Sequence, residues 1–167
     1  MKRWITLFVA TAGFALWAQA GSAQAPAATT LSFYEPGTGG TFKIIDQAPR
    51  SPAKNPESKK YRFSVGDEVF FSERVFDHKG GTRLGTLYGE GKVVKGTTFA
   101  NLLVIAEVVY AFNNGDQLVA HGIFSFAKDA RVAITGGTGA YQGARGSVVS
   151  VDSTTDDSSQ DTVTLLP

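Results

Sequence analysis

The chain has 167 residues, a length that suits one domain, with 16 basic and 15 acidic side chains and a formal net charge of +1. That balance gives no electrostatic case for a nucleic-acid partner. The absence of cysteine excludes disulfides, thiolate nucleophiles and cysteine-ligated metals, and the 19 glycines indicate many turns rather than long helices.

The first 25 residues show the order of features that is typical of a secretory signal peptide. A basic start at Lys2 and Arg3 precedes an apolar stretch, and two sites of the Ala-x-Ala type follow. The apolar stretch is shorter than the roughly 20 residues that a membrane span needs, which favours cleavage over anchoring. We therefore expect cleavage after position 20, 23 or 25, a secreted or periplasmic protein, and no stable membrane insertion.

From Thr29 onward, β-branched and aromatic runs recur between Gly, Asn and Asp residues, and no amphipathic helical stretch of three turns is present. Residues 36–60 are expected to form a long loop, interrupted by the apolar piece 42–45 and rich in Pro and Lys at about 46–60. The acidic stretch 152–159 is expected to be a solvated loop. The remaining runs predict a single β-domain over 29–167 with eight strands, at 30–34, 68–76, 83–94, 101–112, 117–127, 131–135, 146–151 and 162–166.

The connections between these runs are short, and Asn114-Gly115 is a step that favours a tight hairpin turn. Short hairpins without crossover helices predict an all-β sandwich or a closed antiparallel up-and-down barrel. The runs 102–105 and 108–112 are apolar on both faces, which indicates that both faces are covered. A filled barrel whose outer face packs against other subunits would satisfy this pattern, so we expect a homo-oligomer.

A glycine cluster at 134–146 is the most distinctive stretch. A dinucleotide fingerprint needs G-x-G-x-x-G at the start of a helix, whereas the spacing of Gly137, Gly139 and Gly143 is one residue longer and a strand follows. The cluster therefore favours a tight connection between two strands, in which glycines adopt positive φ, over a phosphate site.

This cluster resembles the Gly-Gly-Thr-Gly-aromatic turn of the dirigent and allene oxide cyclase superfamily. Leu31–Glu35 is similar to the cyclase strand that ends in Tyr-Glu, and the likeness covers about residues 31–151. Further similar segments lie, in the same order, at 65–72, 76–89 and 114–122. The resemblance implies an eight-stranded, lipocalin-like barrel, often trimeric, with an apolar cavity and with neither a metal nor an organic cofactor.

Glu35 is the candidate catalytic residue, because it matches the glutamate that lies at the cavity of the cyclases. A carboxyl among Phe and Tyr side chains would have a raised pKa and could donate a proton. The alternative is a solvated glutamate at a strand end beside Pro36. The chain departs from plant cyclases at Gly37, where they have Asn, and near Gly91, where they have Cys, and it is closer to bacterial-type members.

Five further residues are candidates for lining the lumen: Tyr34, Tyr88, Glu107, Tyr110 and Arg145. Glu107 either lines the lumen or faces solvent or a partner, since its parity leaves both open. Arg145 matches an arginine of the dirigent glycine motif, and its alternative is a salt bridge at the barrel end. The two histidines have no spacing that makes a metal pair.

These patterns predict a secreted barrel that binds an apolar small molecule in its lumen and steers the cyclisation or coupling of that molecule. The alternatives are a non-catalytic barrel that carries an apolar ligand and a purely structural oligomeric barrel, in either case a trimer or a dimer. The lumen separates these possibilities. Polar groups that converge in a cavity of about 300 Å³ or more favour chemistry, whereas a solidly packed lumen excludes both enzyme and carrier.

Overall fold

The computed structural model describes residues 27–56, 58–126 and 129–167, so the expected signal peptide lies outside the described residues. No helix in this part of the chain is long and apolar enough to cross a membrane. The described residues form two 3-10 helices, η1 (Phe99–Asn101) and η2 (Gly139–Tyr141). They also form the strands β1 (Thr29–Glu35), β2 (Thr41–Ile45), β3 (Glu68–Phe76), β4 (Arg83–Lys95), β5 (Leu103–Phe112), β6 (Gln117–Ser125), β7 (Ala130–Thr138), β8 (Gly146–Asp152) and β9 (Ser159–Leu165).

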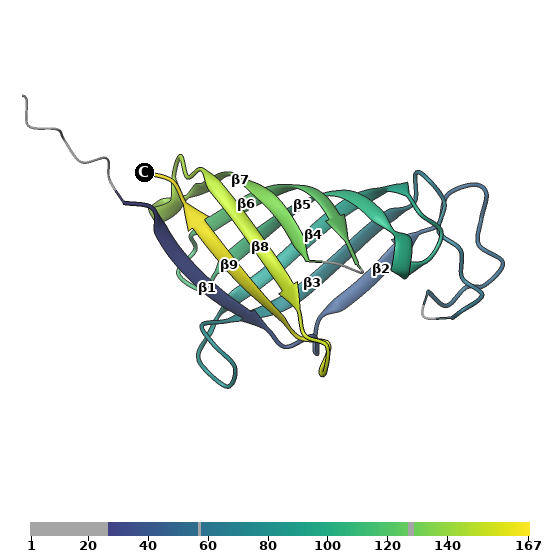
Figure 1. The fold of residues 1–167 in the computed structure, drawn as a ribbon, viewed down its shortest axis with the longest axis horizontal. Coiled ribbons are helices and arrows are strands. Elements are labelled where there is room, and N and C mark those ends of the chain that lie inside the picture. The colour runs from purple at the N-terminus through teal and green to yellow at the C-terminus, as the bar shows by residue number, and fades with distance from the viewer. Residues whose placement is uncertain (1–26, 57, 127–128) are drawn as a thin grey trace, which may run out of the picture.

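The strands form one antiparallel sheet that curls into a closed barrel (Figure 1). Its order is β1-β9-β8-β7-β6-β5-β4-β3, and β3 returns to β1 through the pair Tyr34–Phe76. Eight strands therefore close the ring, and β2 is an extra strand on β3. The predicted all-β, eight-stranded antiparallel barrel is confirmed.

β2 was expected only as an apolar interruption of a loop, but it pairs with β3 from Thr41–Ser72 to Ile45–Glu68. The reason is that β1 meets β3 at one residue pair only, which would leave the rest of that β3 edge without hydrogen-bond partners. The bend between β1 and β2 contains Gly37, which has a φ of 66°. A Cβ at Gly37 would lie 1.9 Å from the carbonyl oxygen of Asp157, so no other residue fits there.

The glycine cluster forms a connection between two strands, as its sequence predicts. β7 runs through Gly136 and Gly137, η2 follows, and β8 begins at Gly146. No helix longer than this single 3-10 turn opens there among the described residues, so the geometry for a bound pyrophosphate is missing.

Side chains that alternate inward along the strands build two buried clusters. One cluster centres on Phe33, Leu87 and Tyr110. The other includes Tyr61 and Phe63, which come from the segment between β2 and β3 and pack against barrel residues such as Val69. The ring of Phe63 lies 5.0 Å from that of Tyr61 and 4.9 Å from that of Phe99, centroid to centroid. Residues 61–63, which directly follow the predicted loop, thus contribute a buried end to the barrel.

Asp67 fixes this segment to the barrel, and its side chain is fully buried. Its carboxylate accepts hydrogen bonds from the backbone N–H groups of Gln47 (2.8 Å) and Ser64 (2.9 Å) and from the hydroxyl of Ser64 (2.8 Å). These charge-assisted bonds hold both ends of the segment to one buried group.

We predict that Asp67→Ala lowers the free energy of unfolding by about 2–4 kcal/mol, because it leaves buried N–H donors without an acceptor. Urea denaturation followed by circular dichroism measures the loss. Glu68→Gln is the control, since Glu68 makes only a 3.8 Å surface contact with Lys92. Equal stability of Asp67→Ala and the control would contradict the anchoring role.

Candidate active site

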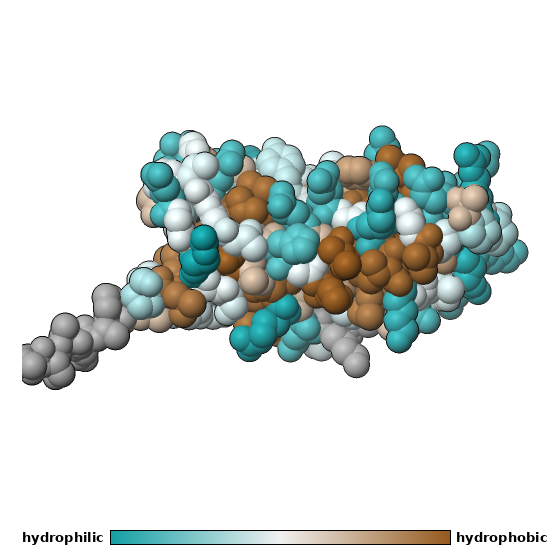
Figure 2. All heavy atoms as spheres, turned by 90° about the horizontal axis from the view of Figure 1, so that it is seen from above, coloured by the Kyte–Doolittle hydropathy of each residue, from teal (hydrophilic) through white to brown (hydrophobic). Residues whose placement is uncertain are grey.

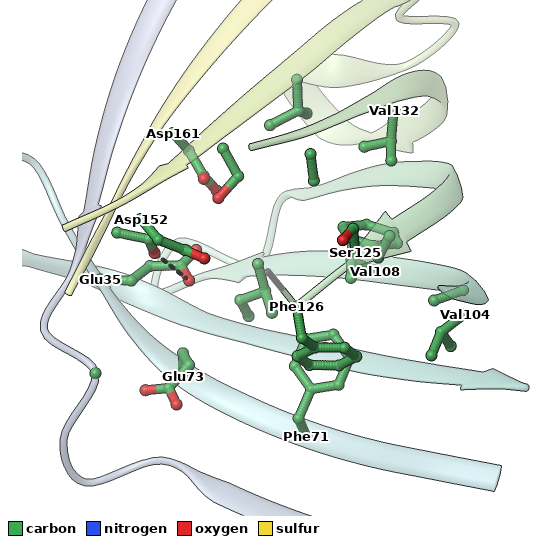
Figure 3. A pocket seen from close by; sticks show the side chains of 18 of the residues that line it. Glu35, Phe71, Glu73, Val104, Val108, Ser125, Phe126, Val132, Asp152 and Asp161 are labelled. Atoms are coloured by element: carbon green, nitrogen blue, oxygen red, sulfur yellow. Dashed lines mark hydrogen bonds between the residues drawn. The ribbon is translucent and has the colours of Figure 1, made fainter. Parts of the chain in front are cut away.

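The barrel encloses a cavity of about 290 Å³, and each of the strands β1 to β9 contributes residues to its lining. Figure 3 shows that the cavity has two unlike sides. Carboxyl groups line the side built by four neighbouring strands, β8, β9, β1 and β3, and they belong to Asp152, Asp161, Glu35 and Glu73. Apolar side chains dominate the other side, and they include Phe71, Leu87, Val104, Val108, Phe124, Phe126 and Val132.

Strand parity points Glu35 into the barrel. Phe33 and Glu35 alternate with the outward-facing Ser32 and Tyr34 on β1, and only 8% of Glu35 is exposed. The hydroxyl of Ser159, the residue paired with Glu35 across β1 and β9, donates a hydrogen bond of 3.3 Å to Glu35 Oε2. The other oxygen, Oε1, is buried, and no N–H or hydroxyl group of another described residue donates to it.

Asp161 lies beside Glu35 because of the register between β1 and β9. Asp161 pairs with Phe33, so the two carboxyl groups project from adjacent strands on the same inner face. Only 2% of Asp161 is exposed, and its Oδ2 accepts a short hydrogen bond from the hydroxyl of Tyr110 on β5. Its Oδ1 is buried and has no donor either.

Burial is the main cause that raises the pKa of Glu35 well above its usual range, and the nearby charge of Asp161 and a hydrogen bond between the two carboxyls add to it. One proton between the two carboxyls satisfies oxygens that no other donor reaches, as in other paired acids. Burial likewise raises the pKa of the Tyr110 hydroxyl, with help from Asp161 and Glu35. Glu35 is therefore a group that keeps a proton to higher pH and can give it to a bound molecule.

The pKa values of two further carboxyl groups at the cavity are also raised. Burial raises the pKa of Glu73, opposed by the charge of Arg74. Burial also raises the pKa of Asp152, together with the charges of Asp129 and Asp161. No group of three His, Cys, Asp or Glu side chains in the described residues has a geometry that could hold a metal ion.

The family model for allene oxide cyclase matches residues 40–152, more than half of the chain. The chain belongs to the allene oxide cyclase family. No curated protein matches it.

Solved structures show the same fold at low sequence identity. A pyocyanin demethylase is 19% identical with a TM-score of 0.58, over 83% of this chain and 99% of the other. A pterocarpan synthase dirigent protein is 16% identical with a TM-score of 0.58, over 85% and 95%. A nonspecific heme-binding cyclase that catalyses a [4 + 2] cycloaddition in neoabyssomicin biosynthesis is 15% identical with a TM-score of 0.53, over 84% and 64%.

In this allene oxide cyclase family member, two of the six sequence-selected residues come together at the cavity. Glu35 and Tyr110 both line it, and both contact Asp161. Tyr34 does not line it, because it alternates with the inward-facing Phe33 and Glu35.

The other three candidates lie on the outside of the barrel, so their placement in the lumen is wrong. Leu87 and Val108 point inward, which turns Tyr88 and Glu107 outward, and 55% of Tyr88 is exposed. Arg145 is exposed within the glycine cluster, where its guanidinium donates to the backbone carbonyls of Thr135 (3.2 Å) and Ala144 (3.0 Å). It forms neither a lumen contact nor the alternative salt bridge.

Asp161 and Glu73 are the important cavity residues that sequence reasoning missed. Asp161 lay between the acidic loop expected at 152–159 and the strand predicted at 162–166, but β9 begins at Ser159, three residues before that predicted strand. Asp161 shares the parity of the apolar Val163, which places the two on one face of β9 without telling that this face is the lumen. Glu73 likewise shares the inward parity of Phe71 and Val75 on β3.

The raised pKa of Glu35 predicts how stability depends on pH. The folded state holds the Glu35 proton at pH values where the unfolded chain has lost it, so the free energy of unfolding falls as pH rises from about 4.5 towards the folded-state pKa. Glu35→Gln removes this loss, and its unfolding free energy should decline less steeply over that range. Urea denaturation at half-unit pH steps, with Glu68→Gln as the control, measures the difference. Parallel curves for wild type and Glu35→Gln would contradict a raised pKa.

Proposed function

We propose that the barrel binds an apolar small molecule in its cavity and steers the cyclisation or coupling of that molecule, with Glu35 as the proton-transferring group. One observation carries this proposal. Glu35 is buried at a cavity whose opposite side is apolar, its pKa is raised so that it keeps its proton to higher pH, and its Oε1 accepts no hydrogen bond from an N–H or hydroxyl group of another described residue.

The apolar side of the cavity supplies the steering. Walls formed by aromatic and branched aliphatic side chains limit the conformers of a flexible substrate and exclude water that would capture a reactive intermediate. The shape of the cavity, rather than a set of polar contacts, then fixes the relative positions of the reacting atoms of the substrate. The volume of about 290 Å³ lies at the lower end of the usual range for ligand sites, which favours a compact substrate.

The acidic side supplies the proton. Glu35 gives its proton to the substrate atom that gains electron density, and the Glu35 carboxylate formed keeps the hydrogen bond from Ser159. When the product rearranges, the same carboxylate takes a proton back, so the enzyme ends in its starting state. Tyr110 holds Asp161 in place and thereby fixes the position of the Glu35 partner.

Ligand binding and turnover are expected to separate in two variants. Ser150 lines the cavity on β8, so Ser150→Leu fills space there and should weaken binding of the neutral dye N-phenyl-1-naphthylamine by about tenfold. Ser147→Leu, on the same strand outside the cavity lining, is the control. Dye fluorescence on protein purified natively from the exported fraction measures both, and mass spectrometry of the same protein identifies co-purified ligands.

Glu35→Gln should retain dye binding and lose most turnover of the identified ligand, because glutamine cannot give up a proton at this position. Equal dye affinity in Ser150→Leu and Ser147→Leu would contradict binding in the cavity. Undiminished turnover in Glu35→Gln would remove Glu35 from the mechanism and favour the carrier function.

We also propose that the protein is a homo-oligomer that assembles through the outer face of β4, β5 and β6. The register places the outward residues of these strands in rows: one apolar row is Tyr88, Val109 and Val119, and another ends in Ile105 and Ile123. About half of the Tyr88 and Ile123 surfaces is exposed. Figure 2 shows hydrophobic side chains that reach the surface in clusters between hydrophilic ones. Exposed apolar rows on a sheet are typical of a face that another subunit covers.

The double variant Ile105→Lys and Ile123→Lys should be monomeric, whereas the wild type should be a dimer or trimer by light scattering after size exclusion. Like charges directly opposite each other on the covered face would repel across the interface and between the strands. Val65→Lys changes an exposed apolar residue outside the strands and should leave the assembly unchanged. A monomeric wild type at micromolar concentration would overturn this proposal.

A further inference from the structure

The charged side chains that line the cavity in the described residues are all acidic. Of the residues that line it in the described part of the chain, none is Lys, Arg or His. Five are acidic: Glu35, Glu73, Asp152, Asp157 and Asp161. Such an enclosure attracts positive charge and repels carboxylates and phosphates, because low-dielectric walls strengthen the field of the groups that line it.

Some carboxyl oxygens on this acidic side have no hydrogen-bond donor within the described part of the protein. The buried oxygens Glu35 Oε1, Glu73 Oε2 and Asp161 Oδ1 receive no hydrogen bond from another group of the described chain. A proton shared between Glu35 and Asp161 can serve two of them, and Glu73 Oε2 still has no donor. Because buried polar groups are almost always hydrogen-bonded, oxygens of this kind indicate a missing donor.

The nearest cation does not fill this role. Arg74 neighbours Glu73 on β3, and its charge lowers the pKa of Glu73. Its Nη2 donates to the backbone carbonyl of Thr38 at 2.7 Å, its buried Nε has no hydrogen-bond partner, and Arg74 does not line the cavity. On the cavity side of these carboxyl groups, a ligand that carries a donor would therefore complete the hydrogen bonding.

Aromatic side chains stand opposite the carboxyl groups. Phe71, Phe124 and Phe126 line the same cavity, and Figure 3 shows Phe71 and Phe126 on the side away from Glu35 and Asp161. Aromatic faces attract cations and stack on flat rings, so this side favours the same type of molecule as the acidic side.

We propose that the ligand of this cavity is a compact aromatic molecule that carries a positively charged nitrogen. The nitrogen lies against Glu35, Asp161 and Glu73, and the ring lies between the phenylalanine side chains. This inference rests on the proposed function, in which the cavity binds a small molecule, and it narrows the class of that molecule from apolar to aromatic and cationic.

The proposal implies that binding expels a proton. The groups around Glu35 are Asp161 and Ser159 on β9, Glu73 on β3, Tyr110 on β5 and Asp152 on β8, and none of them carries positive charge. A cation placed there stabilises the ionised carboxylates, so binding lowers the pKa of Glu35 and favours loss of its proton, to the substrate where an atom accepts it and to solvent for ligands that have no such atom. Affinity for a cation should therefore increase as pH rises.

Three bicyclic probes of similar shape and different charge test this inference: N-methylquinolinium, 1-methylnaphthalene and 1-naphthoate. Titration calorimetry at pH 7.5 should give about tenfold tighter binding of the cation than of the neutral probe, with the anion weakest. Titrations in two buffers with different ionisation enthalpies should show proton release for the cation only.

Glu73→Gln should reduce the affinity for N-methylquinolinium by about tenfold and leave the affinity for 1-methylnaphthalene within about twofold. Glu68→Gln, which removes a carboxylate from the outer surface, should change neither. If the neutral probe binds as tightly as the cation or tighter, this inference falls and the apolar-ligand function stands. If none of the three probes binds, both fall.

Discussion

The pairing of β1 with β9 is the interaction on which the rest of the molecule depends. Seven residue pairs, from Thr29–Leu165 to Glu35–Ser159, join the first and last strands of the barrel and so close the sheet on itself. The same register sets Glu35 and Asp161 on one inner face, where both are buried and where no Lys, Arg or His among the described residues lines the cavity. A slip of β1 by one residue would turn Glu35 to the outside, away from Asp161, and bring Tyr34 inward, since side chains alternate along a strand. Closure of the fold and assembly of the acidic pair are therefore one event.

The division of the cavity follows the order of strands around the ring. Acidic side chains come from β8, β9, β1 and β3, which are neighbours in space although they lie at both ends of the sequence. The remaining strands, which follow one another along the chain, contribute mainly apolar side chains. This arrangement separates the carboxyl groups that hold protons from the apolar side chains that fit the ligand. Residues on one side of the cavity can therefore be substituted while those on the other side are kept.

The barrel was predictable from sequence because strand runs and short turns are local signals, and the glycine cluster marked the family. The site was predictable only in part. Glu35 followed from the resemblance, and Tyr110 from its position within an apolar strand. The predictions for Tyr88 and Glu107 were wrong because strand parity shows which residues share a face, but not which face is the lumen. Asp161 was missed because its place opposite Phe33 depends on a pairing between residues more than 120 positions apart, which no local pattern contains.

The junction between β1 and β3 is a place where the wall of such a barrel can change during evolution. β1 and β3 touch at a single pair, and the bend between β1 and β2 spans that gap, with Gly37 and Thr41 lining the cavity. The width of the cavity at this point therefore depends on the length of the five-residue connection between β1 and β2. It does not depend on backbone hydrogen bonds between strands or on the two buried clusters. Insertions in loops cost little stability. Descendants of this chain could accordingly acquire new ligands by lengthening or shortening residues 36–40, while the acidic pair and the packed ends of the barrel stay as they are.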